Sequence, residues 1–378
     1  MLLVFHSVVW LHTSPLASSW LSLAISRRMG IGGWLVKWSA LFIVMAALIT
    51  PVQGQSVIAP TPYNVLDKLG DGDIGTGQPQ KLTQATFELV AKELSNWGRW
   101  GSDDELGAVN LITPAKRIEA AALVKIGTSV SLAHSDSTER TVDNNPPFGH
   151  NMLTTGADPS ARFAFDQFVV SFHTEFITHI DALSHVFDGD KLYNGFPRQS
   201  VTEAGAQKLD VLQLKDGVFT RGVLFDIPRL KGRPYLDPGE AIYPADLERW
   251  EKQAGIAVEP GDVVLIRTGR WQRRKVFGAF IPTAGLDVSC ARWLHQHDVA
   301  VLGSDAKSDV IPSRVNGIAM PIHLLVIASM GMPILDNLDL ERLADLAAAQ
   351  RRWAFLFTVA PEPVPGGTGS PVNPTAIY

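Results

Sequence analysis

The sequence predicts an α/β fold with a mixed or antiparallel sheet at its core. Short runs rich in Val, Ile and Phe, which are typical of strands, occur along the chain between segments with helical patterns. The two kinds of segment do not alternate strictly, and no G-x-G-x-x-G motif follows a strand. A doubly wound nucleotide-binding sheet is therefore not indicated.

A local sequence pattern predicts each expected strand and helix. Apolar runs predict strands at 128–134, 167–173, 222–227, 262–269 and 299–305. Periodic segments predict helices at 113–126, 243–255, 289–298, 321–331 and 337–350. Thr113 can cap the first helix, with Pro114 in its first turn, and the helices at 243–255 and 321–331 end at a glycine.

Residues 1–54 are read as a targeting region. Lys37 precedes an apolar core of about a dozen residues, which Pro51 and Gly54 interrupt. The core is short for a spanning helix, so we expect a secretory signal cleaved near Gly54 and a periplasmic or secreted protein that meets the membrane only through this segment. Two alternatives stay open: translation could start at Met29, or residues 1–26 could form a poor membrane segment of their own.

Three further parts follow along the chain. Residues 55–89 are rich in Pro and Gly and predict an extended N-terminal arm. Residues 90–360 predict the folded domain, without an internal repeat. Residues 361–378, PEPVPGGTGSPVNPTAIY, predict a C-terminal tail that runs over the surface.

Composition limits the possible functions. The net charge is −5 and there is no long basic run, so we expect no nucleic-acid partner. Cys290 is the one cysteine in the sequence. It can form neither an internal disulfide nor a multi-thiolate metal site, so any metal must be held by His, Asp and Glu.

The segment FVVSFHTEFITHID (168–181) carries most of the potential chemistry. It favours a strand, because eight of its first eleven residues are Val, Phe, Thr or Ile. Alternate side chains of a strand share one face. That face would hold His173, Glu175, Ile177, His179 and Asp181, and His185 follows four residues later.

Two structural alternatives compete with a metal site. A solvated strand face is one, but such faces usually carry Lys and Arg, and this one has neither. A helix with Glu175/His179 and Asp181/His185 four residues apart is the other, but the H-E-x-x-H order of zinc proteases is missing. Neutral imidazoles and carboxylates suit a divalent ion, Zn²⁺ or Mn²⁺, so we predict a metal site.

The segment THIDALSH (178–185) resembles the core of the H-x-G-T-H-x-D-x-P-x-H signature of the cyclase family, which includes bacterial kynurenine formamidases and isatin hydrolases. Five further segments occur in the order found in the longer branch of this family. They are NWGRWGSDDELGAVNLITPAKR (96–117), RGVLFDIPRL (221–230), VEPGDVVLIRTGRW (258–271), GSDAKSD (303–309) and PIHLLVIASMGMPILDNLDLE (321–341). The resemblance covers roughly residues 90–360 as one domain.

The resemblance implies a swivelling β/β/α domain that forms dimers or higher homo-oligomers. It places metal-binding positions at Glu175, His179, Asp181 and His185. It also identifies His323 and Asp336 with the second histidine and acid of the dinuclear site in formamidases, where the acid is a Glu.

This chain departs from the signature at three positions. Glu175 stands at the first histidine, Ile177 at the glycine and Leu183 at the proline. Glu175 could ligate through oxygen, or His173 could reach the ion from two residues back along the strand.

The activity implied is that of an arylformamidase-like, metal-dependent hydrolase, acting on an amide or lactam C–N bond of a small, aromatic substrate. His185 is the expected proton shuttle, and Trp97, Trp100 and Phe148 are candidate walls for a flat substrate, although core packing explains the tryptophans equally well. In GSDAKSD, Asp305 and Asp309 could face the site or cap turns, and the turn role is preferred. The alternatives are a lactonase or dehydratase on the same site, and a non-catalytic periplasmic binding protein.

Overall fold

The structure is a computed structural model, and it describes residues 82–378. The predicted secretory signal and most of the predicted N-terminal arm lie outside these residues. Within residues 82–378, none of the helices is long and apolar enough to cross a membrane. Helix α2 begins at Gln84, inside the segment that was expected to be an extended arm.

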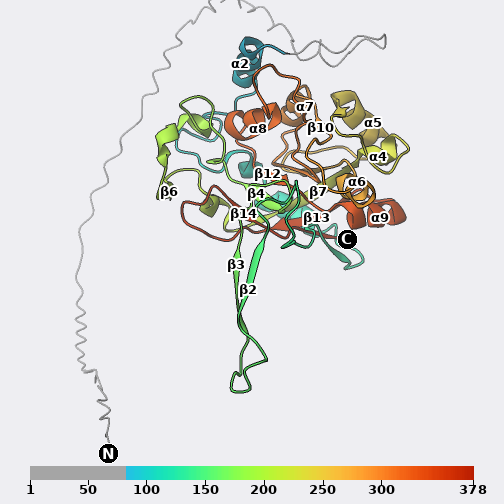
Figure 1. Ribbon diagram of the computed structural model, residues 1–378. Coiled ribbons are helices and arrows are strands. Elements are labelled where there is room, and N and C mark those ends of the chain that lie inside the picture. Colours follow the sequence, from blue (N-terminus) through green and yellow to red (C-terminus); the bar gives the residue numbers. More distant parts are fainter. Residues whose placement is uncertain (1–81) are drawn as a thin grey trace, which may run out of the picture. The chain divides into compact units, whose positions relative to one another are not determined.

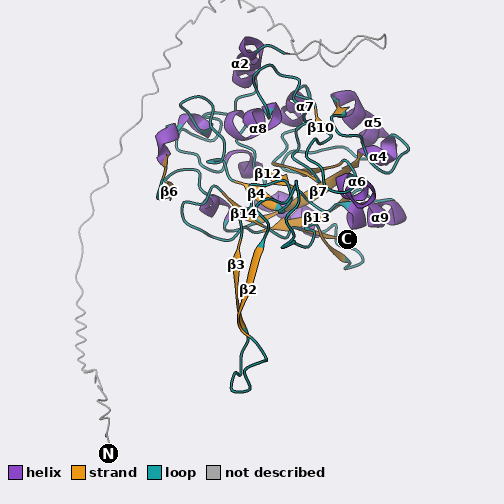
Figure 2. Ribbon diagram, in the orientation of Figure 1, coloured by secondary structure: helices purple, strands orange, loops and turns teal. Residues whose placement is uncertain are grey.

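In the described part of the chain, nine strands form one mixed sheet (Figures 1 and 2). Four central strands, β7, β9, β11 and β12, run parallel, and antiparallel strands flank them on both sides. In spatial order the strands are β1 (Ser129–Ser131), β15 (Thr375–Ile377), β13 (Ala354–Val359), β7 (Val218–Asp226), β9 (Val263–Arg267), β11 (Val301–Ser304), β12 (Ile334–Asp336), β4 (His179–Asp181) and β14 (Gly369–Pro371).

Helices connect the parallel strands, as parallel pairing requires. Every residue of β9 and of β11 is buried, which is why both strands read as continuous apolar runs in the sequence. The α-helices are α2 (Gln84–Glu93), α3 (Pro114–Ala121), α4 (Ile227–Leu230), α5 (Pro244–Ala254), α6 (Arg270–Phe277), α7 (Cys290–Gln296), α8 (Pro321–His323) and α9 (Glu341–Gln350).

The remaining elements are short. A π-helical segment, η5 (Leu324–Ser329), continues α8, so the helix predicted at 321–331 is present in two parts. The 3₁₀ turns are η1 (Gly107–Leu111), η2 (Tyr193–Gly195), η3 (Arg198–Ser200) and η4 (Val211–Leu214). Three two-stranded sheets pair β2 (Gly149–Thr154) with β3 (Phe165–Val169), β5 (Val201–Thr202) with β6 (Gly205–Ala206), and β8 (Ala241–Ile242) with β10 (Gly285–Leu286).

The prediction of one strand through 168–181 is wrong. Strand β3 ends at Val169, the chain then bends, and β4 begins at His179. Phe176 and Ile177 turn inward to pack with Trp271 in a small apolar cluster of their own. The backbone carbonyls of Thr174 and Ile177 accept hydrogen bonds from the side-chain amide of Asn337, at 2.8 and 3.1 Å, instead of joining a strand ladder.

The prediction of a surface tail at 361–378 is also wrong, because this segment supplies two strands of the large sheet. Strand β14 pairs with β4, and β15 lies between β1 and β13. Pro371 is tolerated because β14 is an edge strand. Gly369 is required because a Cβ there would lie 2.5 Å from the carbonyl oxygen of Ile180.

Candidate metal centre

Two neighbouring strands and one helix bring four of the predicted ligands together. Strand β4 carries His179 and Asp181 on one face, since their positions alternate along the strand. Asp336 ends β12 and is paired in register with His179, and His323 ends α8. All four side chains are buried. We call these four residues the inner cluster.

The spacing within the inner cluster suits ligands of one ion. His179 Nε2 lies 3.4 Å from Asp181 Oδ1, and His323 Nε2 lies 3.2 Å from Asp336 Oδ2 and 3.7 Å from Asp181 Oδ2. Two atoms that each lie 2.0–2.2 Å from a zinc ion at a tetrahedral angle are about 3.4 Å apart. These three separations are close to those of ligands around a shared cation, and the ligand atoms of His179, Asp181 and Asp336 all lie within 4.8 Å of one another.

Hydrogen bonds on the far side of both imidazoles orient them toward the cluster. His179 Nδ1 donates to the carbonyl oxygen of Ile177 at 2.8 Å, and His323 Nδ1 donates to Asp309 Oδ2 at 2.6 Å. Each ring then presents Nε2 to the carboxylates. Such partners are usual behind metal-binding histidines, because they fix the tautomer and the ring orientation.

His173 and His185 line the accessible side of the inner cluster. Their rings stack with centroids 3.9 Å apart, and their side chains are 27% and 26% exposed. His173 Nδ1 lies 2.9 Å from Asp181 Oδ1, and His185 Nε2 lies 4.0 Å from Asp181 Oδ2. Asp181 thus belongs to two groups of three residues that could each hold an ion. It is joined by His173 and His185 in the first group, and by His179 and Asp336 in the second.

The electrostatics of the cluster favour a positive charge inside it. Burial opposes ionisation of Asp181, but hydrogen bonds from His173 and His179 hold the pKa of its carboxyl well below the usual range. Burial also opposes a charged His323, yet Asp336 and Asp309 raise the pKa of its imidazole well above the usual value. The same carboxylates that stabilise an imidazolium would stabilise a metal cation in its place.

One carboxylate oxygen of the cluster is free to bind a cation. Asp336 Oδ1 is buried and has no hydrogen-bond partner, although buried carboxylate oxygens are usually paired. A divalent ion held by nitrogen and oxygen ligands would satisfy it. The donor set, imidazoles and carboxylates without sulfur, therefore fits such an ion.

Glu175 and His173 have different surroundings. Glu175 forms an ion pair with Lys307 and is in neither of the two ligand groups. His173 is in one of them. Of the two alternatives for the first ligand position, the arrangement favours His173, although the strand register that suggested it is not formed.

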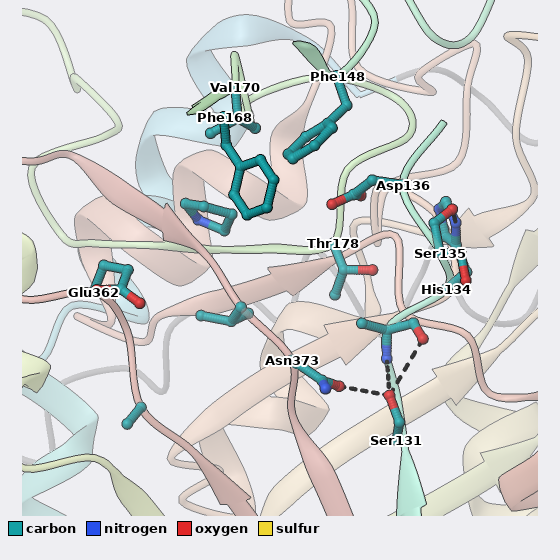
Figure 3. A pocket seen from close by; sticks show the side chains of 14 residues that line it. Ser131, His134, Ser135, Asp136, Phe148, Phe168, Val170, Thr178, Glu362 and Asn373 are labelled. Carbon is teal, nitrogen blue, oxygen red and sulfur yellow. Dashed lines mark hydrogen bonds between the residues drawn. The ribbon is translucent and has the colours of Figure 1, made fainter. Parts of the chain in front are cut away.

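The three predicted aromatic walls have different surroundings. Trp97 donates from Nε1 to the carbonyl oxygen of Ala328 at 2.8 Å, and Trp100 packs against the main core beneath the guanidinium of Arg99. Phe148 lines a cavity at the base of the β2–β3 hairpin, which none of the cluster residues line (Figure 3). Their role in substrate binding stays a prediction.

Asp309 contacts the cluster, an alternative that the sequence interpretation had ranked behind a turn role. It accepts hydrogen bonds from the backbone amides of Ile322 and His323 as well as from the His323 ring. A turn role was expected from GSDAKSD, and nothing local in that segment indicates a contact with a helix that begins twelve residues later. An aspartate shortly before a histidine-bearing helix was the only available signal.

Comparisons with known proteins agree with this fold. The family profile described as "Putative cyclase" matches residues 104–308. A crystal structure described as a novel cyclase is 33% identical, covers 76% of this chain and 99% of its own, and has a TM-score of 0.69. None of the curated proteins compared with the chain matches it.

Two solved isatin hydrolases share the fold at lower identity. One, bound to the product analogue thioisatinate, is 20% identical over 70% of this chain and 95% of its own, with a TM-score of 0.50. Isatin hydrolase A from Labrenzia aggregata, bound to benzyl benzoate, is 19% identical over 68% and 94%, with a TM-score of 0.50. From the profile match and the relative at 33% identity, the chain belongs to the cyclase family.

Proposed function

We propose that this protein is a metal-dependent hydrolase that cleaves an amide or lactam C–N bond in a small aromatic substrate. The observation that carries the proposal is the buried carboxylate of Asp181, which His173, His179, His185 and His323 approach to within 2.9–4.0 Å. Membership of the cyclase family and the fold shared with isatin hydrolases support it.

The residues divide into three roles. His179, Asp181 and Asp336, with His323 beside them, would hold a divalent ion, Zn²⁺ or Mn²⁺, and His173 would reach it from the accessible side through the group that it forms with Asp181 and His185. Such an ion polarises a carbonyl and lowers the pKa of a bound water from 15.7 towards about 7. Asp309 orients His323 from behind.

His185 is suited to move protons. Burial, with neighbouring His173, His323 and His179 acting against the attraction of Asp181, lowers the pKa of its imidazole to about 4. The ring is therefore neutral near pH 7, and its free nitrogen could accept a proton from the attacking water, as a weaker base than an imidazole with a pKa near 7. It can then return that proton to the leaving nitrogen, and its partial exposure gives it access to the substrate side.

The experiment measures metal content and hydrolysis together. The purified protein is analysed for bound metal and then assayed in parallel on a formanilide, a cyclic aromatic lactam, an aromatic ester and a lactone. We expect Zn²⁺ or Mn²⁺ in the protein and turnover of the formanilide or the lactam. Asp181→Asn should lose both the metal and the activity.

Asp345→Asn, at an exposed position on α9, serves as the matched control and should retain both. Turnover restricted to the ester and lactone would replace the proposal with a lactonase. Bound metal without turnover of any substrate would favour a binding protein, and Asp181→Asn would then have no activity to lose.

A further inference from the structure

Asn337 lies directly beyond the point where the pairing of β4 with β12 ends. The last pair of that ladder is His179 with Asp336, two residues of the inner cluster. The next residue along the chain, Asn337, is fully buried and has a left-handed backbone, with a φ of 57°. Asparagine adopts this conformation more readily than most residues that carry a side chain. The backbone therefore leaves the strand conformation immediately after Asp336.

The side chain of Asn337 continues the contact between the two strands. Its Nδ2 donates to the carbonyl oxygens of Thr174 and Ile177, at 2.8 and 3.1 Å. The backbone carbonyl oxygen of Asn337 accepts from Thr178 Oγ1 at 2.7 Å. All three partners belong to the bend that precedes β4. One residue thus fastens the segment that leads into His179.

The carbonyl oxygen of Ile177 is shared by Asn337 and His179. It accepts from Asn337 Nδ2 at 3.1 Å and from His179 Nδ1 at 2.8 Å. A carbonyl oxygen has two lone pairs, so it can accept both hydrogen bonds. The bond from Nδ1 leaves His179 Nε2 directed at Asp181, 3.4 Å away. The position of the Ile177 carbonyl therefore decides where this candidate ligand atom lies.

Arg270 fixes which end of the Asn337 amide faces that carbonyl. Its Nη1 donates to Asn337 Oδ1 at 2.8 Å, and its side chain is only 1% exposed. A guanidinium can only donate a hydrogen bond, and a backbone carbonyl can only accept one. One orientation of the amide therefore satisfies both sides, with Oδ1 toward Arg270 and Nδ2 toward the bend.

We propose that Asn337 is a positioning residue for the metal centre, acting on His179 through the carbonyl oxygen of Ile177. Groups behind a metal-binding histidine fix the orientation of its ring and contribute to metal affinity. The inner cluster then has two such supports, Asp309 behind His323 and Asn337 behind the acceptor of His179. The inference rests on the proposed function, because the position of the imidazole matters to affinity only where a cation binds.

Two variants separate the amide from the backbone turn. Asn337→Gly keeps the left-handed conformation, which glycine adopts freely, and removes the amide. Asn337→Asp keeps the shape and can pair with Arg270, but it presents a carboxylate oxygen to the carbonyls of the bend. Both variants should weaken Zn²⁺ binding about 10–100-fold. Asn151→Asp, at an exposed position on β2, is the matched control and should bind Zn²⁺ like the wild type.

Three measurements distinguish positioning from a general loss of stability. Competition with a chromophoric chelator gives the Zn²⁺ affinity, and urea denaturation of the metal-free protein gives the free energy of unfolding. Hydrogen exchange should become faster in peptides that cover residues 172–178 of both variants, with protection elsewhere unchanged. The visible absorption of Co²⁺ bound in place of Zn²⁺ should also change, because it reports the arrangement of the ligands. A residue that only stabilises the fold would leave that spectrum unaltered.

A double-mutant cycle tests the route through His179. Asn337→Gly should change the affinity of the His179→Gln protein by less than about twofold, because the ring that it positions is gone. Its effect should add to that of Asp309→Asn, which acts on a different candidate ligand, His323.

An equal loss of affinity in the wild-type and His179→Gln backgrounds would overturn the proposal, as would unchanged affinity in both Asn337 variants. A wild-type protein that binds neither Zn²⁺ nor Mn²⁺ would overturn the proposed function and this inference with it. The two failures are therefore distinguished by the affinity of the wild type alone.

Discussion

The Nδ1 atom of His323 lies 2.6 Å from Oδ2 of Asp309, and this contact decides which ring nitrogen faces the metal centre. Asp309 belongs to the loop after β11, whereas His323 ends α8. The carboxylate accepts the Nδ1 proton and leaves Nε2 directed at Asp336. Under the proposed function, Asp309 would therefore act as a positioning residue for His323.

Asp309→Asn tests this relationship. The asparagine oxygen can still accept from the Ile322 amide, but its NH₂ group, facing Nδ1, would favour the opposite tautomer. We expect metal affinity to fall about 10–100-fold with the fold intact. Competition with a chromophoric chelator measures the affinity, and circular dichroism checks the fold. Unchanged affinity, as expected for Asp345→Asn, would show that Asp309 only caps α8.

His185→Gln should separate catalysis from metal binding. His185 Nε2 lies 4.0 Å from Asp181, farther than any other imidazole of the cluster, so the inner cluster can hold the ion without it. We expect metal content to stay near the wild-type level while kcat falls about 10²–10⁴-fold, the usual contribution of a general acid or base. Loss of the metal in this variant would instead identify His185 as a ligand.

Variants of Glu175 and His173 can show which of the two residues binds the metal. Glu175 is neutralised by Lys307, whereas His173 approaches Asp181 to 2.9 Å. We expect Glu175→Gln to retain the metal and His173→Gln to weaken its binding. Elemental analysis after dialysis against a weak chelator measures both. The reverse result would return Glu175 to the ligand position that the sequence motif implies.

The strands that were predicted correctly are those whose own apolar composition indicates a buried strand. Strands β9 and β11 and the second half of β7 are mostly apolar and buried in the middle of the sheet, so local composition was sufficient. The segment before β4 has the same composition, but Phe176 and Ile177 pack against Trp271 and Asn337 binds its carbonyls. Trp271 and Asn337 lie about a hundred residues or more away in the sequence, so no local pattern predicts that they interrupt the strand.

The candidate ligands also divide into those that a local pattern predicts and those that it does not. His179 and Asp181 were predicted to share a face, and they do so because β4 is a strand, although only three residues long. His323 and Asp336 came from the family resemblance, because a helix end and a strand end look unremarkable in isolation. The pairing of β14 with β4 was missed because proline and glycine are typical of loops, and their tolerance at a sheet edge is visible only once the edge is known.

Asp305 provides a test that concerns stability instead of metal. Its buried carboxyl accepts hydrogen bonds from Thr268 N and Oγ1, at 2.8 and 2.7 Å, and from Gly269 N at 2.8 Å. Burial, aided by the charge of Glu341 and opposed by the Thr268 hydrogen bonds, raises its pKa to about 6. The folded protein therefore binds a proton at Asp305 more tightly than the unfolded chain does, whose aspartates have pKa values of about 3.9.

The sign of the resulting pH dependence follows from linkage. A raised pKa contributes stability below about pH 4, and that contribution is lost as the pH rises through about 6. Two pKa units correspond to roughly 3 kcal/mol at most. Asp305→Asn cannot ionise, so the free energy of unfolding of the wild type minus that of the variant should decrease between pH 4 and pH 6.5. Urea titrations across this range measure the difference, and an increase with pH would contradict the raised pKa.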